Sequence, residues 1–357
     1  MNPLTNTLYD IAIIGAGVAG SYCANALQQA GYQVCLLEKG RGTGGRASSR
    51  RLVSADNAPQ QSCDLGAPFF HHEFPQLTKD IDHWLAAGVI APWPVANNDK
   101  GLAFTGTPSM SALTRYLSRH CEVYSSQRVS HIDRIDDVWQ LRDERYQLLL
   151  QAKRVVITAP AAQSAQLLTS ADAPQEWLQQ AHRASRQCRP QWAAVVSDEG
   201  DNDSSISGLF NPLDVEHPVL TKIICDSVKP ERQATKQRWV IQANLDWSEA
   251  NKDTKAEVVA EAMLAAFNDL LTAQTEIKIN AVIATPHLWR LGRHQTSNQQ
   301  AFSMPCDPVS IPCDPVSMLW DKECGLAVAA DWLGTGTVAS AMLSAQQLSA
   351  AIIADKP

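Results

Sequence analysis

The sequence lacks several features that would assign it to a specialised class of protein. It has no surplus of basic residues, because 30 lysines and arginines stand against 37 aspartates and glutamates, giving a formal net charge of −7. This balance argues against wholesale binding to nucleic acid or to an anionic membrane. No stretch reaches the ~18 consecutive apolar residues of a membrane-spanning helix. What remains is an ordinary globular composition, 45% hydrophobic and 19% charged.

The nine cysteines lack any CxxC pair. They are scattered and odd in number, so neither a disulfide framework nor a zinc site is indicated, and no metal is expected. The first residues also lack the basic and apolar regions of a signal peptide. We therefore expect a reduced, cytoplasmic protein, whose oligomeric state the sequence leaves unknown.

A strand, a glycine turn and a helix are predicted at the start of the sequence. Residues 9–14 form a short apolar run typical of a buried parallel strand, and the motif GAGVAG follows at 15–20. In this motif Gly15 makes the turn, Gly17 lets the backbone approach a pyrophosphate, and Gly20 lets the helix lie close to the strand. A pyrophosphate would meet backbone N–H groups and the positive end of the helix dipole.

An acidic residue follows at the spacing that a dinucleotide-binding fold uses. A second strand at 33–37 ends in Glu38, about 20 residues after the turn, where a carboxylate accepts hydrogen bonds from a ribose diol. The alternative is a glycine turn in some other α/β unit, which the combination of strand, helix and acidic residue makes the less favoured interpretation. The sequence thus predicts a Rossmann-type nucleotide site.

A second glycine-rich stretch, GTGGRA at 42–47, offers backbone amides and the guanidinium of Arg46 to another phosphate-rich surface. It is followed by DLGAPFF at 64–70. The order of these motifs resembles the flavin-containing amine oxidase superfamily and, within it, the renalase-like branch. The resemblance implies non-covalent FAD as the cofactor, with GGR at its phosphates and LGA beside the isoalloxazine ring.

The carboxyl-terminal part carries the other flavin signature of that superfamily. Asp331 ends a strand and precedes a glycine loop and a small-residue helix from about 338 to 354. The helix would stabilise negative charge on a reduced flavin. The residues that the motifs and the resemblance together assign to the cofactor are Gly15, Gly17, Val18, Ala19, Gly20, Glu38, Lys39, Gly44, Gly45, Arg46, Gly66, Ala67, Pro68, Phe69, Val129, Ala159, Trp289, Asp331, Thr337 and Val338.

The fold class expected is α/β, with a FAD-binding Rossmann-type domain (parallel sheet plus β-meander) interleaved with an α+β substrate domain that has a mixed or antiparallel sheet. We predict that residues 1–73, 105–160 and 284–357 form the discontinuous FAD-binding domain. Residues 74–104 and 161–283 are predicted to form the substrate domain.

Several strands are placed by their apolar patterns. Individual strands are expected at 121–132, 146–150, 154–160 and 281–290, the last with a terminal Trp-Arg pair. The pattern Cys-Asp-Pro-Val-Ser occurs at 306–310 and again at 313–317, which we interpret as a duplicated surface loop rather than a metal site.

The resemblance places few residues at the reaction centre, because a flavin carries the redox chemistry itself. We assign catalytic roles to His72 and Trp289 and substrate contacts to Phe70, Gln242 and Arg290. The alternatives remain open: the aromatic residues can be core packing, His72 a structural histidine, and Arg290 an ordinary ion-pair partner. Arg293 is a further candidate for binding a pyrophosphate.

The function that the resemblance implies is oxidation of a reduced, possibly isomeric, dihydronicotinamide or related small molecule, with hydride transfer to flavin N5 and reoxidation by oxygen. No lysine can be matched to the one that amine oxidases place near N5. The alternatives are a flavin amine oxidase or desaturase-like enzyme, a non-catalytic flavin-binding protein, and a nicotinamide-dependent dehydrogenase. No nucleic-acid or membrane partner is expected.

Overall fold

The computed structural model describes residues 7–51, 62–200, 214–232, 236–275, 279–295 and 317–356. Contacts divide the chain into two compact units, each assembled from distant segments. Unit 1 comprises Met1–Gly45, Thr114–Cys188 and His294–Pro357, and unit 2 comprises Arg46–Leu113 and Arg189–Arg293. The division into a FAD-binding and a substrate domain stays a prediction.

Unit 1 is built around an eight-stranded sheet with the path β17-β18-β11-β1-β2-β8. From β18 to β8 every neighbouring pair on this path is parallel, whereas β17 is antiparallel to β18 and β10 is antiparallel to β11 and β9. The strands are β1 (Leu8–Ile14), β2 (Val34–Glu38), β8 (Glu122–Ser125), β9 (His131–Ile135), β10 (Val138–Arg142), β11 (Leu148–Ile157), β17 (Met318–Asp321) and β18 (Leu326–Ala329).

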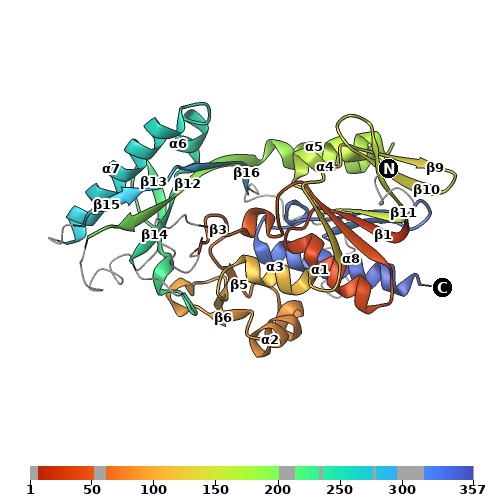
Figure 1. Cartoon of the computed structure of the whole chain (residues 1–357), viewed down its shortest axis with the longest axis horizontal. Coiled ribbons are helices and arrows are strands. Elements are labelled where there is room, and N and C mark those ends of the chain that lie inside the picture. Colours follow the sequence, from red (N-terminus) through yellow and green to blue (C-terminus); the bar gives the residue numbers. More distant parts are fainter. Residues whose placement is uncertain are drawn as a thin grey trace, which may run out of the picture. The chain divides into compact units, whose positions relative to one another are not determined.

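Two helices of unit 1 lie side by side along the sheet, α1 (Val18–Gln29) and α8 (Val338–Ala354) (Figure 1). Their contact faces are rich in alanine and serine, whose small side chains allow the close approach of Cys23 Sγ to the carbonyl of Ala345 at 3.8 Å. The helices α4 (Ala161–Ser170) and α5 (Gln175–Arg186) pack on the core around Trp139 and Trp332. Helix α3 (Ser111–Ser118) crosses the boundary between the two units.

Unit 2 contains an antiparallel sheet ordered β13-β14-β12-β15, with β16 also paired to β12. Helix α7 (Ala256–Gln274) covers it, placing Met263 and Phe267 against Trp239 and its neighbours, and α6 (Leu245–Ala250) lies nearby (Figure 1). The strands are β12 (Cys188–Asp198), β13 (Leu220–Cys225), β14 (Arg238–Ala243), β15 (Ala281–Ile283) and β16 (His287–His294).

A smaller part of unit 2 is a three-stranded sheet ordered β5-β7-β6. Its strands are β5 (Phe70–His71), β6 (Ile90–Pro92) and β7 (Ala103–Gly106), and α2 (Thr78–Ala86) connects β5 to β6. A short pair, β3 (Arg50–Arg51) and β4 (Ser62–Cys63), precedes it. The α/β fold class predicted from the sequence, with a parallel sheet and a separate antiparallel sheet, is thus confirmed.

Four predicted strands have different bounds in the structure. The segments 146–150 and 154–160 are one strand, β11, because its residues pair with β10 on one side and with β1 on the other. The predicted strand 121–132 stops at Ser125, since Ser126 has a φ of 58°. The strand expected at 281–290 is divided before Pro286, which lacks a ladder donor, so Trp289 lies inside β16 rather than at a strand end.

The repeat at 306–317 lies, except for Ser317, outside the described residues. Within the described residues no helix is both long and apolar enough to cross a membrane, and no group of metal-binding side chains is found. Among these residues, the seven cysteines form no disulfide bond.

We predict that Met263→Ala lowers the free energy of unfolding by about 2–5 kcal/mol, because it leaves a cavity where a fully buried side chain packs on the sheet of unit 2. Val258→Ala, on the same helix but 54% exposed, is the matched control and should change that energy by less than about 0.5 kcal/mol. Urea denaturation measures both. Equal losses would contradict the packing described for α7.

Candidate functional site

The glycine loop after β1 is shaped to receive a ligand in unit 1. Gly15 has a φ of +105°, and a Cβ there would lie 2.9 Å from Thr158 Oγ1. A Cβ on Gly20 would lie 1.9 Å from the carbonyl oxygen of Gly15, so only glycine lets α1 start against the loop. Gly17, in contrast, has nothing within 4 Å of such a Cβ. The loop is therefore closed on the protein side and open at Gly17.

Helix α1 begins at this open position without a side-chain cap. Its N-cap residue is Gly17, which has no side chain to accept a hydrogen bond from the first turn. No acidic residue lies in that turn. The first N–H groups of a helix have no partner within the helix, and the helix dipole adds positive potential to them. Val18 and Ala19 supply N–H groups of this kind. The end of α1 can thus hold phosphate oxygens.

Glu38 lies against the same loop. Its carboxylate is buried and accepts hydrogen bonds from the backbone N–H of Ala16 at 2.9 Å and of Gly40 at 2.6 Å. A carboxylate has about four lone-pair directions, so acceptor capacity remains for hydroxyl donors. The predicted pairing of Glu38 with a ribose diol is consistent with this position.

The second glycine-rich stretch folds back on the first within unit 1. Gly44 donates its N–H to the carbonyl of Ala16 at 2.8 Å, and a Cβ on Gly45 would lie 3.3 Å from Gly17 Cα. Lys39 is exposed just after β2, and Val129 lies in the connection between β8 and β9 rather than in a strand. Both remain predicted cofactor contacts.

Asp331 follows strand β18 at the same edge of the sheet. Strand β18 is parallel to β11, and β11 is parallel to β1, so Ala159, Asp331 and the glycine loop all follow the carboxyl ends of parallel strands. The carbonyl of Asp331 accepts bonds from the N–H groups of Gly334 and Gly336, each at 3.0 Å, which bends the chain into α8. Thr337 caps that helix by accepting from Ser340 N at 3.1 Å, and Val338 is its first residue.

In unit 2, backbone contacts define the loop at 65–69, which the resemblance places beside an isoalloxazine ring. A Cβ on Gly66 would lie 1.9 Å from the carbonyl oxygen of Arg46, and Ala67 donates its N–H to that oxygen at 2.8 Å. Trp289 Nε1 donates to the carbonyl of Leu65 at 3.3 Å. We call residues 65–69 the ring loop.

A pair of buried glutamines connects the ring loop to Arg293. Gln242 donates to the carbonyl of Gly66 at 3.0 Å and accepts from Arg293 Nη2 at 3.2 Å. Gln191 accepts from Arg293 Nε at 3.1 Å and donates to the carbonyl of Ala243 at 3.0 Å. The guanidinium is thus held by two neutral side chains. We call Gln191, Gln242 and Arg293 the arginine bracket.

The residue Arg293 is exposed to solvent, although its guanidinium is partly desolvated by the protein around it. Desolvation lowers the pKa of its guanidinium below the ordinary value; Asp214 opposes that effect and Arg46 adds to it. An arginine remains protonated at neutral pH after such a change. Arg290 differs, because it is 70% exposed and lies 3.8 Å from Asp253, an arrangement that contributes little.

Four buried charges lie behind the ring loop. Lys229 Nζ bonds Asp64 Oδ2 at 3.0 Å and Asp226 Oδ1 at 2.8 Å, and Arg232 pairs with both carboxylates. Although desolvation raises the pKa of Asp226, the two cations outweigh it and hold that pKa below its usual range. This buried charge cluster was not predicted, although the spacing of Asp226, Lys229 and Arg232 at every third residue was a signal.

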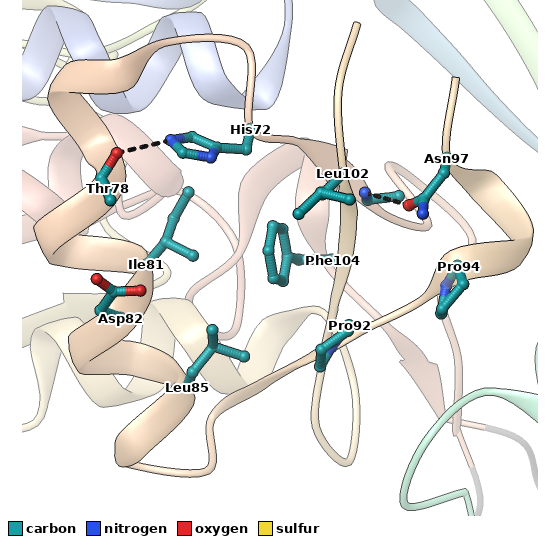
Figure 2. A pocket seen from close by; sticks show the side chains of 11 residues that line it. His72, Thr78, Ile81, Asp82, Leu85, Pro92, Pro94, Asn97, Leu102 and Phe104 are labelled. Carbon is teal, nitrogen blue, oxygen red and sulfur yellow. Dashed lines mark hydrogen bonds between the residues drawn. The ribbon is translucent and has the colours of Figure 1, made fainter. Parts of the chain in front are cut away.

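His72 lies away from these contacts, in a pocket of about 330 Å³ between α2 and the strands β6 and β7 (Figure 2). Thr78 Oγ1 donates to the carbonyl of Pro75 at 2.7 Å, so His72 Nε2, at 3.1 Å, must be the donor to that hydroxyl. Its other neighbours in the pocket are mostly apolar, among them Ile81 and Phe104. The catalytic role of His72 stays a prediction.

The predicted aromatic residues occupy three different surroundings. Phe70 is buried and stacks on Phe104, with ring centroids 5.8 Å apart, which fits core packing. Phe69 is half-buried against Trp93 at 5.4 Å, and Trp289 contacts the ring loop as described. The structure therefore brings Trp289, Gln242 and Gly66 together and leaves Phe70 in the core.

Two comparisons match the amino-terminal part of the chain or a short segment of it. Residues 13–84 match the NAD(P)-binding Rossmann-like domain family. A 78-residue segment is 35% identical to (S)-6-hydroxynicotine oxidase from Paenarthrobacter nicotinovorans; it covers 22% of this chain and only 18% of the length of that relative.

Solved structures are similar over nearly the whole chain. A putative protoporphyrinogen oxidase from Exiguobacterium sp. 255-15 has a TM-score of 0.64 at 12% identity, covering 97% of this chain and 99% of that one. Cyclohexylamine oxidase from Brevibacterium oxydans IH-35A has a TM-score of 0.63 at 14% identity, covering 98% and 99%. These likenesses confirm the predicted fold class.

The glycine loop yields a test of its geometry. We predict that Gly20→Ala lowers the free energy of unfolding by about 1–3 kcal/mol, because its Cβ has no room against Gly15. Gly17→Ala should leave that energy within about 0.5 kcal/mol of the wild type, since the position is open and its φ of −77° suits any residue. Thermal and urea unfolding of both variants measure this. The loop geometry would be refuted if Gly17→Ala were destabilised while Gly20→Ala kept the stability of the wild type.

Proposed function

We propose that the protein is an FAD-dependent oxidoreductase that oxidises a small molecule and passes the electrons to oxygen. The observation that carries the proposal is the shared strand edge in unit 1, where the open glycine loop, Glu38 and Asp331 all follow parallel strands. The similar oxidases named above support the same class. Bound FAD would supply the hydride-accepting ring.

The residues of unit 1 fit a dinucleotide. The uncapped end of α1 binds pyrophosphate oxygens through N–H groups, and open space at Gly17 admits them. Glu38 accepts bonds from the ribose hydroxyls with the lone pairs that Ala16 and Gly40 leave free. The loop after Asp331 binds the flavin half of the molecule, and the α8 dipole stabilises negative charge there.

The donor that we propose is a reduced nicotinamide, including its isomeric dihydro forms, as the renalase-like resemblance implies. The arginine bracket supports this choice over an amine. Arg293 is fixed by two buried neutral side chains, with Asp214 and Arg46 as the charged groups that act on it, and its guanidinium can donate to a phosphate or pyrophosphate of the donor. A protonated amine would be repelled by the guanidinium of Arg293.

Anaerobic mixing tests the proposed function directly. The purified holoprotein should lose its flavin absorbance when mixed with isomeric dihydronicotinamides and recover it when oxygen is admitted. Amines such as putrescine and cyclohexylamine should leave the spectrum unchanged. Bleaching by amines alone would move the donor class to the amine oxidases, and no bleaching by any donor would identify a flavin-binding protein without catalysis.

The two arginines of β16 give a matched pair for the donor. Arg293→Gln should raise KM for the dihydronicotinamide by about 10- to 100-fold, the equivalent of one charge-assisted hydrogen bond, and should leave the FAD content unchanged. Arg290→Gln should change the same KM by less than about twofold, because the exposed ion pair of Arg290 contributes little. Stopped-flow titration measures both. Loss of FAD from the Arg293→Gln protein would instead assign Arg293 to the cofactor.

A further inference from the structure

The buried charge cluster holds one stretch of backbone at both ends. Lys229 Nζ bonds the side chain of Asp64, directly before the ring loop, and the carbonyl oxygen of Pro68, near its end, at 2.9 Å. The side chains of Lys229 and Asp64 are both completely buried. A single ammonium group therefore connects the two ends of a five-residue turn.

The partners of this ammonium are themselves fixed. Asp64 Oδ1 accepts from Ser49 Oγ at 2.7 Å and from the N–H of Met110 at 2.9 Å, while its other oxygen binds Lys229 and Arg232. Thr105 Oγ1 donates to the carbonyl of Pro68 at 3.2 Å. Two carboxylates and two cations balance in charge, as a buried cluster requires.

We propose that Lys229 is a positioning residue for the redox reaction, which it serves by setting the shape of the ring loop. The inference rests on the proposed function, since it needs a flavin beside that loop. Lys229 does not contact the reacting atoms in this account: its donors are used by Asp64, Asp226 and Pro68, and its ammonium lies 5.4 Å from the centroid of the Trp93 ring. It acts through the backbone of Gly66, Ala67 and Pro68.

The geometry separates this role from general stability. Gln242 on β14 donates to the carbonyl of Gly66, and Trp289 on β16 donates to the carbonyl of Leu65. These two bonds remain when Lys229 is replaced, so the first part of the ring loop stays bound. What is lost is the closure between Asp64 and Pro68. A shift of about 1 Å in groups that orient a reaction can cost about 100-fold in rate.

The test compares three variants as holoproteins, with circular dichroism to establish that each is folded. Lys229→Met should slow anaerobic flavin reduction by about tenfold or more and change the positions of the flavin absorbance bands. Thr105→Val, which removes only the second donor to Pro68, should do the same to a smaller degree. Met263→Ala is a destabilised control in the core of unit 2 and should reduce at the wild-type rate. If Lys229→Met does not fold, the rates of flavin reduction of Thr105→Val and Met263→Ala are compared to decide the question.

Hydrogen exchange supplies a readout that needs no flavin. The amides of Leu65, Gly66, Ala67 and Phe69 should exchange faster in Lys229→Met and Thr105→Val than in Met263→Ala. The proposal is overturned if the loop variants reduce as fast as the wild type, or if Met263→Ala is slowed as much as they are. A wild-type protein that takes up no FAD would refute the proposed function instead, while the exchange rates would still report whether Lys229 closes the loop.

Discussion

The parallel pairing of β1, β2, β11 and β18 is the constraint on which the rest of unit 1 depends. Parallel strands end at one edge, so residues more than 300 positions apart in sequence, such as Gly15 and Asp331, follow the same side of the sheet. The two helices that leave this edge differ in a useful way. Thr337 caps α8, whereas α1 begins at an uncapped glycine, so the first turn of α1 keeps the larger capacity for binding phosphate.

Unit 2 solves a different physical problem, which is to hold irregular backbone in a fixed shape. The ring loop has no ladder partners, and its carbonyls are satisfied one at a time by Trp289, Gln242 and Lys229. Buried polar groups without partners are costly, so these side chains define the loop as much as its own sequence does. The same glutamine that binds Gly66 also orients Arg293, which couples the loop shape to the donor that we propose.

Local sequence patterns predicted correctly the elements that depend on residues close together in the sequence. The sequence around β1, α1 and β2 is a complete short-range signature, and the helix expected at 338–354 has these bounds in the structure. The prediction divided strand β11 into two segments, whereas the sheet shows one strand in which Gln151 and Ala152 pair with both β10 and β1. The arginine bracket and the buried charge cluster join distant segments, and no single stretch of sequence contains the register that brings Gln191 to Arg293 or Asp64 to Lys229.

The central claim is that the strand edge of unit 1 holds a whole flavin dinucleotide, with its adenosine half at Glu38. Identifying the cofactor that denaturation releases from the purified protein tests this most directly. The account predicts about one FAD per chain, because the glycine loop and Glu38 would bind its adenosine half and the loop after Asp331 its flavin half, and it expects release without covalent attachment. FMN alone, a nicotinamide dinucleotide, or a protein that neither contains nor takes up FAD would contradict it.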